Sequence, residues 1–327
     1  MTVFISKGGK RSLLKKRRKD SAYDAVENEA ERSLTDVEEI DEKAALVKKN
    51  TLLMNRIWAA FGALALFVGY FALPNLFYSI FSQDAMANNG TVKLLASSMG
   101  FFVYFFFLIR FYMKRSHKTG EELSDVLQLY PRSLECKPAL ICCLLGVSLN
   151  LFIGAALALL PFPEQLIADY SASSGSLVYN DSIVFSVIYV VVLAPVCEEL
   201  MFRGFIFHRL NTQFPLMVTV ISVSLMFALP HIQILWIIVA LANGIIFTLV
   251  RAKFNNLCYS LILHCCYNLV SVPMLLLAGT QIHEFLFNNI FAELVYLILG
   301  GGSVFLCTQW LLKDKDAPNT ELSYDIK

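Results

Sequence analysis

A short stretch of the chain places two carboxylates and an arginine in an otherwise largely apolar run. Glu198, Glu199 and Arg203 lie between Ile183 and Ile206. On a helix, Glu199 and Arg203 share a face, so they can form an ion pair that lowers the cost of burying both. Glu198 then points about 100° away around the helix, without that partner. A carboxylate in such a low-dielectric site suits a general base or acid working near neutral pH.

Two further polar elements follow in later apolar runs. The segment from Phe227 to His231 ends in a histidine, which titrates near neutrality, beside a backbone carbonyl that Pro230 frees. His264 and Asn268 are four residues apart on one helical face, where two neutral donors could hold a developing oxyanion. Each element also has a structural explanation: a solvated helix end for the glutamates, a helix-end histidine, and an interhelical hydrogen bond.

The three elements are more informative together than apart. An ionisable group at the centre of a membrane helix costs at least about 2.5–3.5 kcal/mol, so such groups mark functional sites by default. Pro195 interrupts the backbone ladder just before the two glutamates, which can open a wet pocket there. We therefore predict one intramembrane catalytic site built from Glu198, Glu199, Arg203, His231, His264 and Asn268.

The elements that must position this site are apolar helices. Hydrophobic residues make up 57% of the 327, charged residues 16%, and the mean hydropathy is +0.59, whereas soluble domains are about 25% charged. A membrane span needs about 20 apolar residues. The sequence therefore predicts an all-α fold, a polytopic transmembrane helical bundle of about eight spans, near residues 57–80, 94–113, 138–160, 182–205, 216–230, 232–250, 256–277 and 288–312.

Loop charge predicts the orientation, because cytoplasmic loops are enriched in Lys and Arg. Basic residues gather in the N-terminal tail and after spans two, four, six and eight, whereas the loops after spans one, three and seven hold only Lys93. Both termini are therefore predicted to be cytoplasmic. The predicted divisions are a polar, charged N-terminal region at 1–55, a membrane domain at 56–313 with the motifs in 182–277, and a cytoplasmic tail at 314–327.

Two smaller features are interpreted as structural. The basic cluster from Lys15 to Lys19 is read as a topology signal on a partly disordered tail, although it could also touch anionic lipid headgroups. The eight cysteines form no C-x-x-C pair, so we expect reduced packing residues rather than a zinc or redox centre.

The predicted spans leave one geometric conflict. They place Glu198 near the cytoplasmic end of the fourth span and His231 near the outer end of the fifth, where the two side chains cannot meet. We therefore expect a long fifth helix, tilted or broken near Pro230, with its boundary to the sixth span misplaced.

The ordered set E-E-x-x-x-R, F-x-x-x-H and H-x-x-x-N resembles the CAAX protease and bacteriocin-processing family, also called the ABI family, which includes the type II CAAX prenyl endopeptidases. All three motifs are complete and in order within residues 182–277. The resemblance implies an intramembrane endopeptidase with eight helices and a cavity open to the cytosol. It implies that Glu198 and His231 activate a water. It also implies that His264 and Asn268 polarise the scissile carbonyl or stabilise the oxyanion, while Glu199 and Arg203 are structural or assist.

The resemblance leaves the cofactor and substrate open. Enzymes of this family have been argued to use either a metal or a glutamate alone. Glu and His could bind zinc, but the sequence lacks an H-E-x-x-H helix, so we favour a metal-free site with no cofactor. The expected partners are a peptide or lipidated protein substrate and membrane lipids, with no nucleic acid. A prenylated peptide fits the eukaryotic branch, and a leader, pheromone or bacteriocin precursor fits the bacterial branch. We favour a bacterial plasma membrane.

Two functions of other classes compete with proteolysis. A non-catalytic membrane partner, such as a bacteriocin-immunity-type protein, would bind a peptide in the same cavity. A transporter or channel could use the buried carboxylates to carry protons. The absence of internal repeats in the sequence, and the gathering of polar groups at one depth, argue against the transporter.

Overall fold

Helices account for almost all of the chain that can be described. The computed structural model describes residues 7–81, 90–176, 182–277, 280–287 and 289–313, and these residues contain no strand. The predicted all-α class is confirmed. The chain divides into two compact units, residues 1–58 and 59–327. The predicted cytoplasmic tail at 314–327 lies outside the described residues.

The first unit consists of the N-terminal part of helix α1 (Lys7–Phe81). Alanine, glutamate, lysine, leucine and arginine dominate this part, and the helix contains no proline before Pro74. These residues have high helix propensity, which explains why this part of the chain is helical. From Lys43 to Trp58 every side chain is exposed.

The second unit holds the membrane-spanning helices. Six helical segments within the described ranges are long and apolar enough to cross a bilayer: Lys43–Ile80, which begins in the first unit, Leu94–Thr119, Cys136–Leu159, Ile183–Asn211, Ile234–Phe254 and Gln281–Leu311. Two shorter apolar segments, Leu216–His231 and Leu257–Pro273, coincide with the predicted fifth and seventh spans. The polytopic transmembrane bundle is confirmed, and the protein is an integral membrane protein.

The remaining elements follow one another with short connections. The α-helices are α2 (Gly90–Thr119), α3 (Leu123–Leu127), α4 (Cys136–Leu159), α5 (Glu164–Ser176), α6 (Ile183–Ile188), α7 (Ala194–Glu198), α8 (Phe207–Asn211), α9 (Leu216–Ala228), α10 (Ile234–Phe254), α11 (Leu257–Leu269), α12 (Ser271–Leu276), α13 (Gln281–Phe287), α14 (Ile290–Val295) and α15 (Gly301–Lys313). Short 3-10 turns are η2 (Pro131–Ser133) and η5 (Leu229–His231), and π-helical turns are η3 (Tyr189–Leu193), η4 (Glu199–Ile206) and η6 (Tyr296–Gly300).

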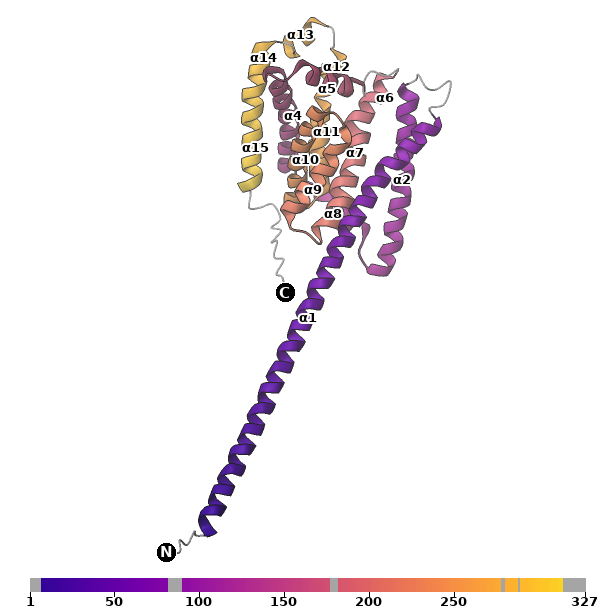
Figure 1. Cartoon of the computed structure of the whole chain (residues 1–327). Helices are drawn as coiled ribbons and strands as arrows, with labels where there is room; N and C mark the ends of the chain where they lie inside the picture. The colour runs from indigo at the N-terminus through magenta and orange to yellow at the C-terminus, as the bar shows by residue number, and fades with distance from the viewer. Residues whose placement is uncertain (1–6, 82–89, 177–181, 278–279, 288, 314–327) are drawn as a thin grey trace. The chain divides into compact units, whose positions relative to one another are not determined.

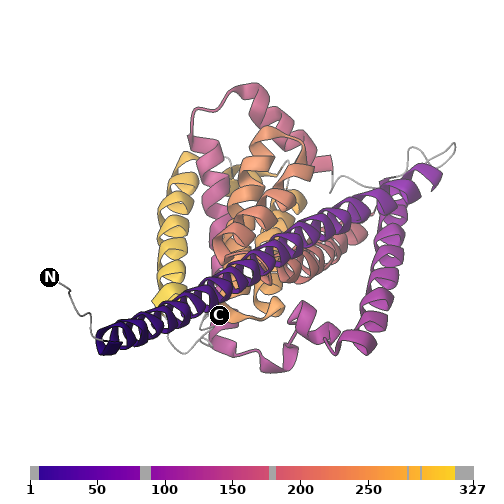
Figure 2. The same ribbon diagram turned by 60° about the horizontal axis from the view of Figure 1, so that its bottom comes forward.

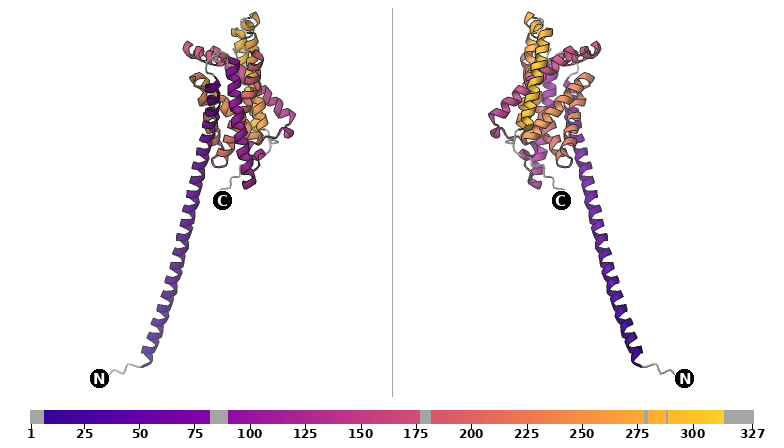
Figure 3. Two further views of the ribbon diagram at one scale, coloured as in Figure 1. Left: turned by 90° about the vertical axis from the view of Figure 1, so that its right-hand side faces the viewer. Right: turned by 90° about the vertical axis from the view of Figure 1, so that its left-hand side faces the viewer.

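These helices form a bundle with two distinct ends. Helices α15 and α2 lie at opposite edges (Figures 1 and 2). Helices α5 and α13 lie at one end, and the connection between α8 and α9 lies at the other (Figures 1 and 3). We call the first of these the α5–α13 end.

The geometric conflict between Glu198 and His231 disappears because the fourth span ends later than predicted, while the predicted limits of the short fifth span hold. The fourth span continues to Asn211 instead of ending near 205, so Glu198 lies about 20 Å from its C-terminal end at 1.5 Å per residue. The expected long fifth helix is wrong: α9 has 13 residues, and the rise from Leu216 to His231 is again about 20 Å. The two residues therefore lie at the same level of the bundle.

Close packing of α11 on α4 fixes the helix that carries His264. Gly146 of α4 makes this possible, because a Cβ there would collide with the carbonyl oxygen of Leu263 and lie 3.0 Å from the backbone nitrogen of Tyr267. Small residues at membrane helix crossings allow such close approach of two backbones. Gly154, on the same helix, has no atom within 4 Å of the same added carbon.

We expect Gly146→Ala to destabilise the protein by about 1–3 kcal/mol, as overpacking of a tight contact does. Gly154→Ala is the matched control, and it should be neutral or slightly stabilising because alanine favours a helix over glycine. Thermal unfolding of both variants in the same detergent measures the difference. Equal melting temperatures for the two variants would contradict the close α4–α11 contact.

Candidate active site

The fourth span changes its helical geometry twice around the glutamates. The π-helical turn η3 precedes α7, and the π-helical turn η4 follows it, so Glu198 ends α7 and Glu199 begins η4. Such turns are rare and frequently lie at functional sites. Pro195 lies in the first turn of α7, just before the two glutamates. The sequence analysis placed an interruption of the backbone hydrogen bonds at this residue, because proline has no N–H.

Glu199 and Arg203 form the predicted ion pair, and it is completely buried. Arg203 Nη1 donates to Glu199 Oε1 at 2.9 Å, with both side chains 0% exposed. The other donors of the guanidinium reach Thr248 Oγ1 and the carbonyl of Gly244, each at 3.3 Å. Its carbon also lies 4.2 Å from the ring centre of Phe227. These contacts from α9 and α10 hold Arg203 in a single position.

His264 joins this pair to Glu198. Its Nδ1 lies 2.9 Å from Glu199 Oε1, the same oxygen that accepts from Arg203. Because an ionised carboxylate only accepts hydrogen bonds, Nδ1 carries a proton. The other ring nitrogen, Nε2, lies 3.6 Å from Glu198 Oε2. A buried carboxylate thus fixes the orientation of a histidine whose second nitrogen faces another carboxylate, as in the orienting part of hydrolase triads.

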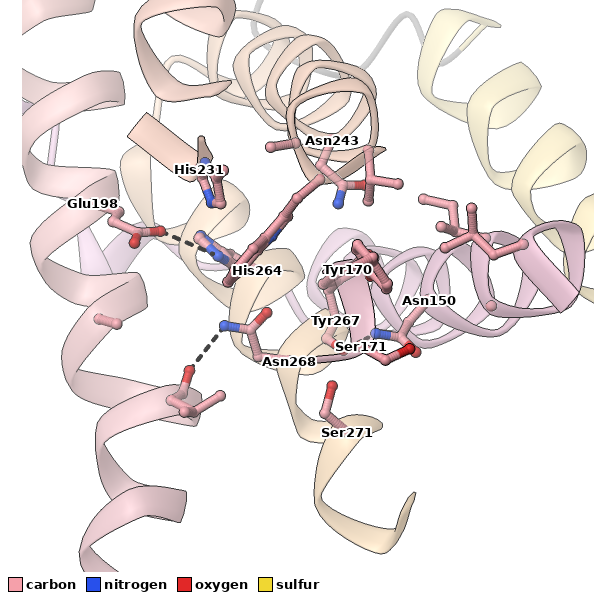
Figure 4. Close-up of a pocket in the computed structure, with 18 of the residues that line it drawn as sticks. Asn150, Tyr170, Ser171, Glu198, His231, Asn243, His264, Tyr267, Asn268 and Ser271 are labelled. Carbon is pink, nitrogen blue, oxygen red and sulfur yellow. Dashed lines mark hydrogen bonds and ion pairs between the residues drawn. The ribbon is translucent and has the colours of Figure 1, made fainter. Parts of the chain in front are cut away.

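Glu198 and His231 both line a cavity of about 830 Å³. The Glu198 side chain is 26% exposed, in contrast to the fully buried Glu199. His231 Nδ1 lies 3.1 Å from the carbonyl oxygen of Ala228. Since a carbonyl accepts, Nδ1 donates and Nε2 is the nitrogen available to a ligand. Figure 4 shows His231, Glu198 and His264 beside one another at the cavity.

Asn268 lies on the same wall but is engaged by the backbone. Its Nδ2 donates to the carbonyl of Val190 at 2.8 Å. In the π-helical register of η3, where the N–H of Ala194 bonds to the carbonyl of Tyr189, the partner of Val190 would be residue 195. That residue is Pro195, which has no N–H. Asn268 therefore supplies the donor that Pro195 lacks and joins α11 to the fourth span.

We expect Asn268→Ala to destabilise the protein by about 1–3 kcal/mol, because the Val190 carbonyl loses its partner. Adding Pro195→Ala should restore part of that stability, since alanine brings back a backbone N–H at the required place. Thermal unfolding of the two single variants and the double variant tests this. Purely additive losses would show that the side-chain amide does not replace a backbone bond.

The cavity also contains polar residues that the sequence analysis did not select. Figure 4 shows several of them: Asn150, Tyr170, Ser171, Asn243, Tyr267 and Ser271. Asn150 and Asn243 interrupt apolar runs, and Asn150 Nδ2 donates to the carbonyl of Tyr267 at 3.0 Å. A search for polar residues inside apolar runs selected His264, and it could also have selected Asn150. Tyr170 and Ser171 lie in a connection between predicted spans, where polar residues are ordinary and give no such signal.

The three motifs thus meet at one cavity, with Glu198, His231, His264 and Asn268 on its wall. Residues 180–270 match the family model for type II CAAX prenyl endopeptidase Rce1-like proteins. The resemblance inferred from the motifs is confirmed for this Rce1-like segment, and it supports a protease-family assignment. No curated protein and no solved structure matches the chain.

The Rce1-like segment does not provide an evident metal centre. Within the described ranges, no group of three or more His, Cys, Asp and Glu side chains is arranged to hold a metal ion. Glu199 is engaged by Arg203 and His264, and His231 Nδ1 by a carbonyl. Among the described residues, the donor set therefore falls short of the three or four protein ligands that a zinc site takes.

Proposed function

We propose that the protein is an intramembrane endopeptidase that hydrolyses a peptide bond of a membrane-associated or lipidated peptide or protein. One observation carries the proposal. The contacts from Arg203 through Glu199 and His264 end at Glu198, a partly exposed carboxylate on the wall of a cavity of about 830 Å³. Such a volume is typical of a ligand-binding pocket.

In the proposed reaction, Glu198 acts as the general base. Its carboxylate takes a proton from a water that the free Nε2 of His231 helps to orient, and the water oxygen attacks the scissile carbonyl carbon. The same carboxyl group then gives the proton to the leaving amine. One proton thus passes from the water to Glu198 and then to the amine nitrogen, and the products are a carboxylic acid and an amine.

His264 is proposed to stabilise the oxyanion. Glu199 engages Nδ1–H of His264, so the proposal requires a second ring proton on Nε2, the nitrogen that faces Glu198. The Nε2–H of that imidazolium can donate to the oxygen that becomes negative in the transition state. Asn268 uses one amide hydrogen on Val190, and its second amide hydrogen is proposed to assist.

The remaining features of the proposal follow from the fold and the loop charges. The partners are the peptide or lipidated protein substrate and the surrounding lipids, and nucleic acid has no role. The basic loops favour cytoplasmic termini, and we propose a bacterial plasma membrane.

The test is cleavage by the purified full chain in detergent, with fluorogenic peptides that do or do not carry a lipid. Wild type and His231→Ala are compared, each with and without a chelator. We expect cleavage by wild type only, unchanged by the chelator. Tight binding of a peptide that wild type never cleaves would instead support a non-catalytic binding protein.

A further inference from the structure

Part of the cavity wall is polar but lies outside the three motifs. It includes Asn150 of α4, Asn243 of α10, Tyr267 of α11 and Glu293 of α14. Asn150 already donates to the backbone carbonyl of Tyr267. Asn243 is different, because its side chain is 5% exposed and its Oδ1 is buried without a hydrogen-bond partner in the part of the chain that the structure describes.

The neighbours of Asn243 hold its side chain in one orientation. The side chain interacts with the hydroxyl of Tyr267, and since Oδ1 is unpaired, the amide nitrogen is the atom that faces this hydroxyl. The next residue along α10, Gly244, accepts hydrogen bonds at its carbonyl from Arg203 Nη2 at 3.3 Å and from Thr248 Oγ1 at 2.7 Å. The backbone beside Asn243 is therefore joined to the buried ion pair, and Oδ1 is a fixed acceptor at the cavity wall.

A buried acceptor without a partner costs about 1–3 kcal/mol. The oxygen of a side-chain amide only accepts, so a ligand that removes this cost must donate. Every peptide residue except proline carries a backbone N–H, and in a cavity lined mainly by apolar side chains that group also needs a partner. A single hydrogen bond between the two groups satisfies both of them.

Asn243 lies close to the residues that would carry out the cleavage. Phe247 follows it by one turn of α10, and the ring centre of Phe247 lies 4.9 Å from that of His264. Tyr267 follows His264 by three residues, which is about 4.5 Å along the axis of α11. An extended peptide advances about 3.3 Å per residue, so Asn243 would meet an N–H about two residues from a bond placed at His264.

We propose that Asn243 accepts a hydrogen bond from a backbone N–H of the bound peptide and thereby sets which peptide bond lies at Glu198 and His264. The inference rests on the proposed function for the nature of the substrate, a peptide, but the hydrogen bond does not require cleavage. Because the N–H belongs to the backbone, this contact fixes the register of the peptide rather than the identity of its side chains.

A series of N-methylated peptides tests the inference. Fluorescence anisotropy measures binding to the purified full chain with Glu198→Gln, so that cleavage does not interfere. The probe is the tightest-binding peptide of the set used in the cleavage assay, labelled and compared with analogues in which one backbone N–H at a time is replaced by N–CH₃. An N-methyl group removes the donor and leaves the side chain unchanged.

We expect one N-methyl position, about two residues from the bond that wild type cleaves, to weaken binding about three- to tenfold, as the loss of one neutral hydrogen bond does. Adding Asn243→Leu should weaken binding of the parent peptide and abolish its advantage over that analogue. Asn243→Ala is the second variant and should give the same result.

Asn75→Leu is the matched control for this substitution. Asn75 is exposed on α1, its side chain donates to the carbonyl of Phe71, and it does not line the cavity. The advantage of the parent peptide should therefore persist in this variant.

Two results would overturn the inference. In the first, no N-methyl analogue binds more weakly than the parent peptide before Asn243 is changed. In the second, the weak position stays weak in Asn243→Leu and Asn243→Ala, so that another group of the protein accepts the N–H. A peptide that shows the expected pattern but is never cleaved by wild type would support the hydrogen bond and contradict the proposed function.

Discussion

Glu198→Gln is expected to lower kcat for peptide cleavage by about 10²–10⁴-fold, the contribution of a general base. Glutamine has almost the same shape as glutamate but cannot take a proton from water. Glu198 is 26% exposed, and its contact with His264 is a long one of 3.6 Å, so the variant should fold normally. Activity is measured on purified protein, and folding is checked by thermal unfolding and size-exclusion chromatography.

Glu135→Gln is the control for this experiment. Glu135 is exposed before the start of α4, its side chain makes no capping hydrogen bond, and it does not line the cavity. Its removal should leave the rate unchanged. Wild-type turnover by Glu198→Gln would remove Glu198 from the reaction, and equal losses in both variants would indicate a general effect of charge.

Arg203→Met is expected to give the largest loss of stability, about 3–5 kcal/mol, because it leaves the buried carboxylate of Glu199 without its cation. Arg203 is 0% exposed, and it contacts α9 and α10 as well as its own span. The loss should appear as a lower melting temperature or as failure to accumulate in the membrane.

The double variant Glu199→Gln with Arg203→Met separates charge from packing. Removing both charges leaves no uncompensated ion, and replacement of a buried pair by neutral groups is often tolerated. We therefore expect the double variant to be more stable than Arg203→Met alone. Its activity should stay low, because His264 no longer has a carboxylate at Nδ1. A double variant as unstable as the single one would show that Arg203 acts through its packing contacts.

The sequence was sufficient to predict the membrane fold and the pairing of Glu199 with Arg203. Apolar length indicated the spans, and the four-residue spacing placed the two charges on one helical face. All eight cysteines are free in the structure, and three of them, Cys142, Cys258 and Cys307, are buried. These properties are local, so they depend on residues close together in the chain.

Other features depend on geometry that spacing does not contain. The bond from Asn268 to Val190 exists because η3 has a π-helical register that places Pro195 where a donor is needed. The position of Glu198 along the bundle, level with His231, depends on the fourth span continuing to Asn211. The place of Glu293 on the cavity wall depends on how α14 packs against distant helices. None of these follows from a hydropathy pattern.

The central claim is that a peptide bond is hydrolysed between Glu198 and His264. An experimental structure of Glu198→Gln with an uncleaved peptide substrate tests this most directly. We expect the scissile carbonyl oxygen within about 3.5 Å of His264 Nε2, with a water between residue 198 and His231. A peptide whose scissile bond lies away from the wall formed by residue 198, His231 and His264 would contradict the claim.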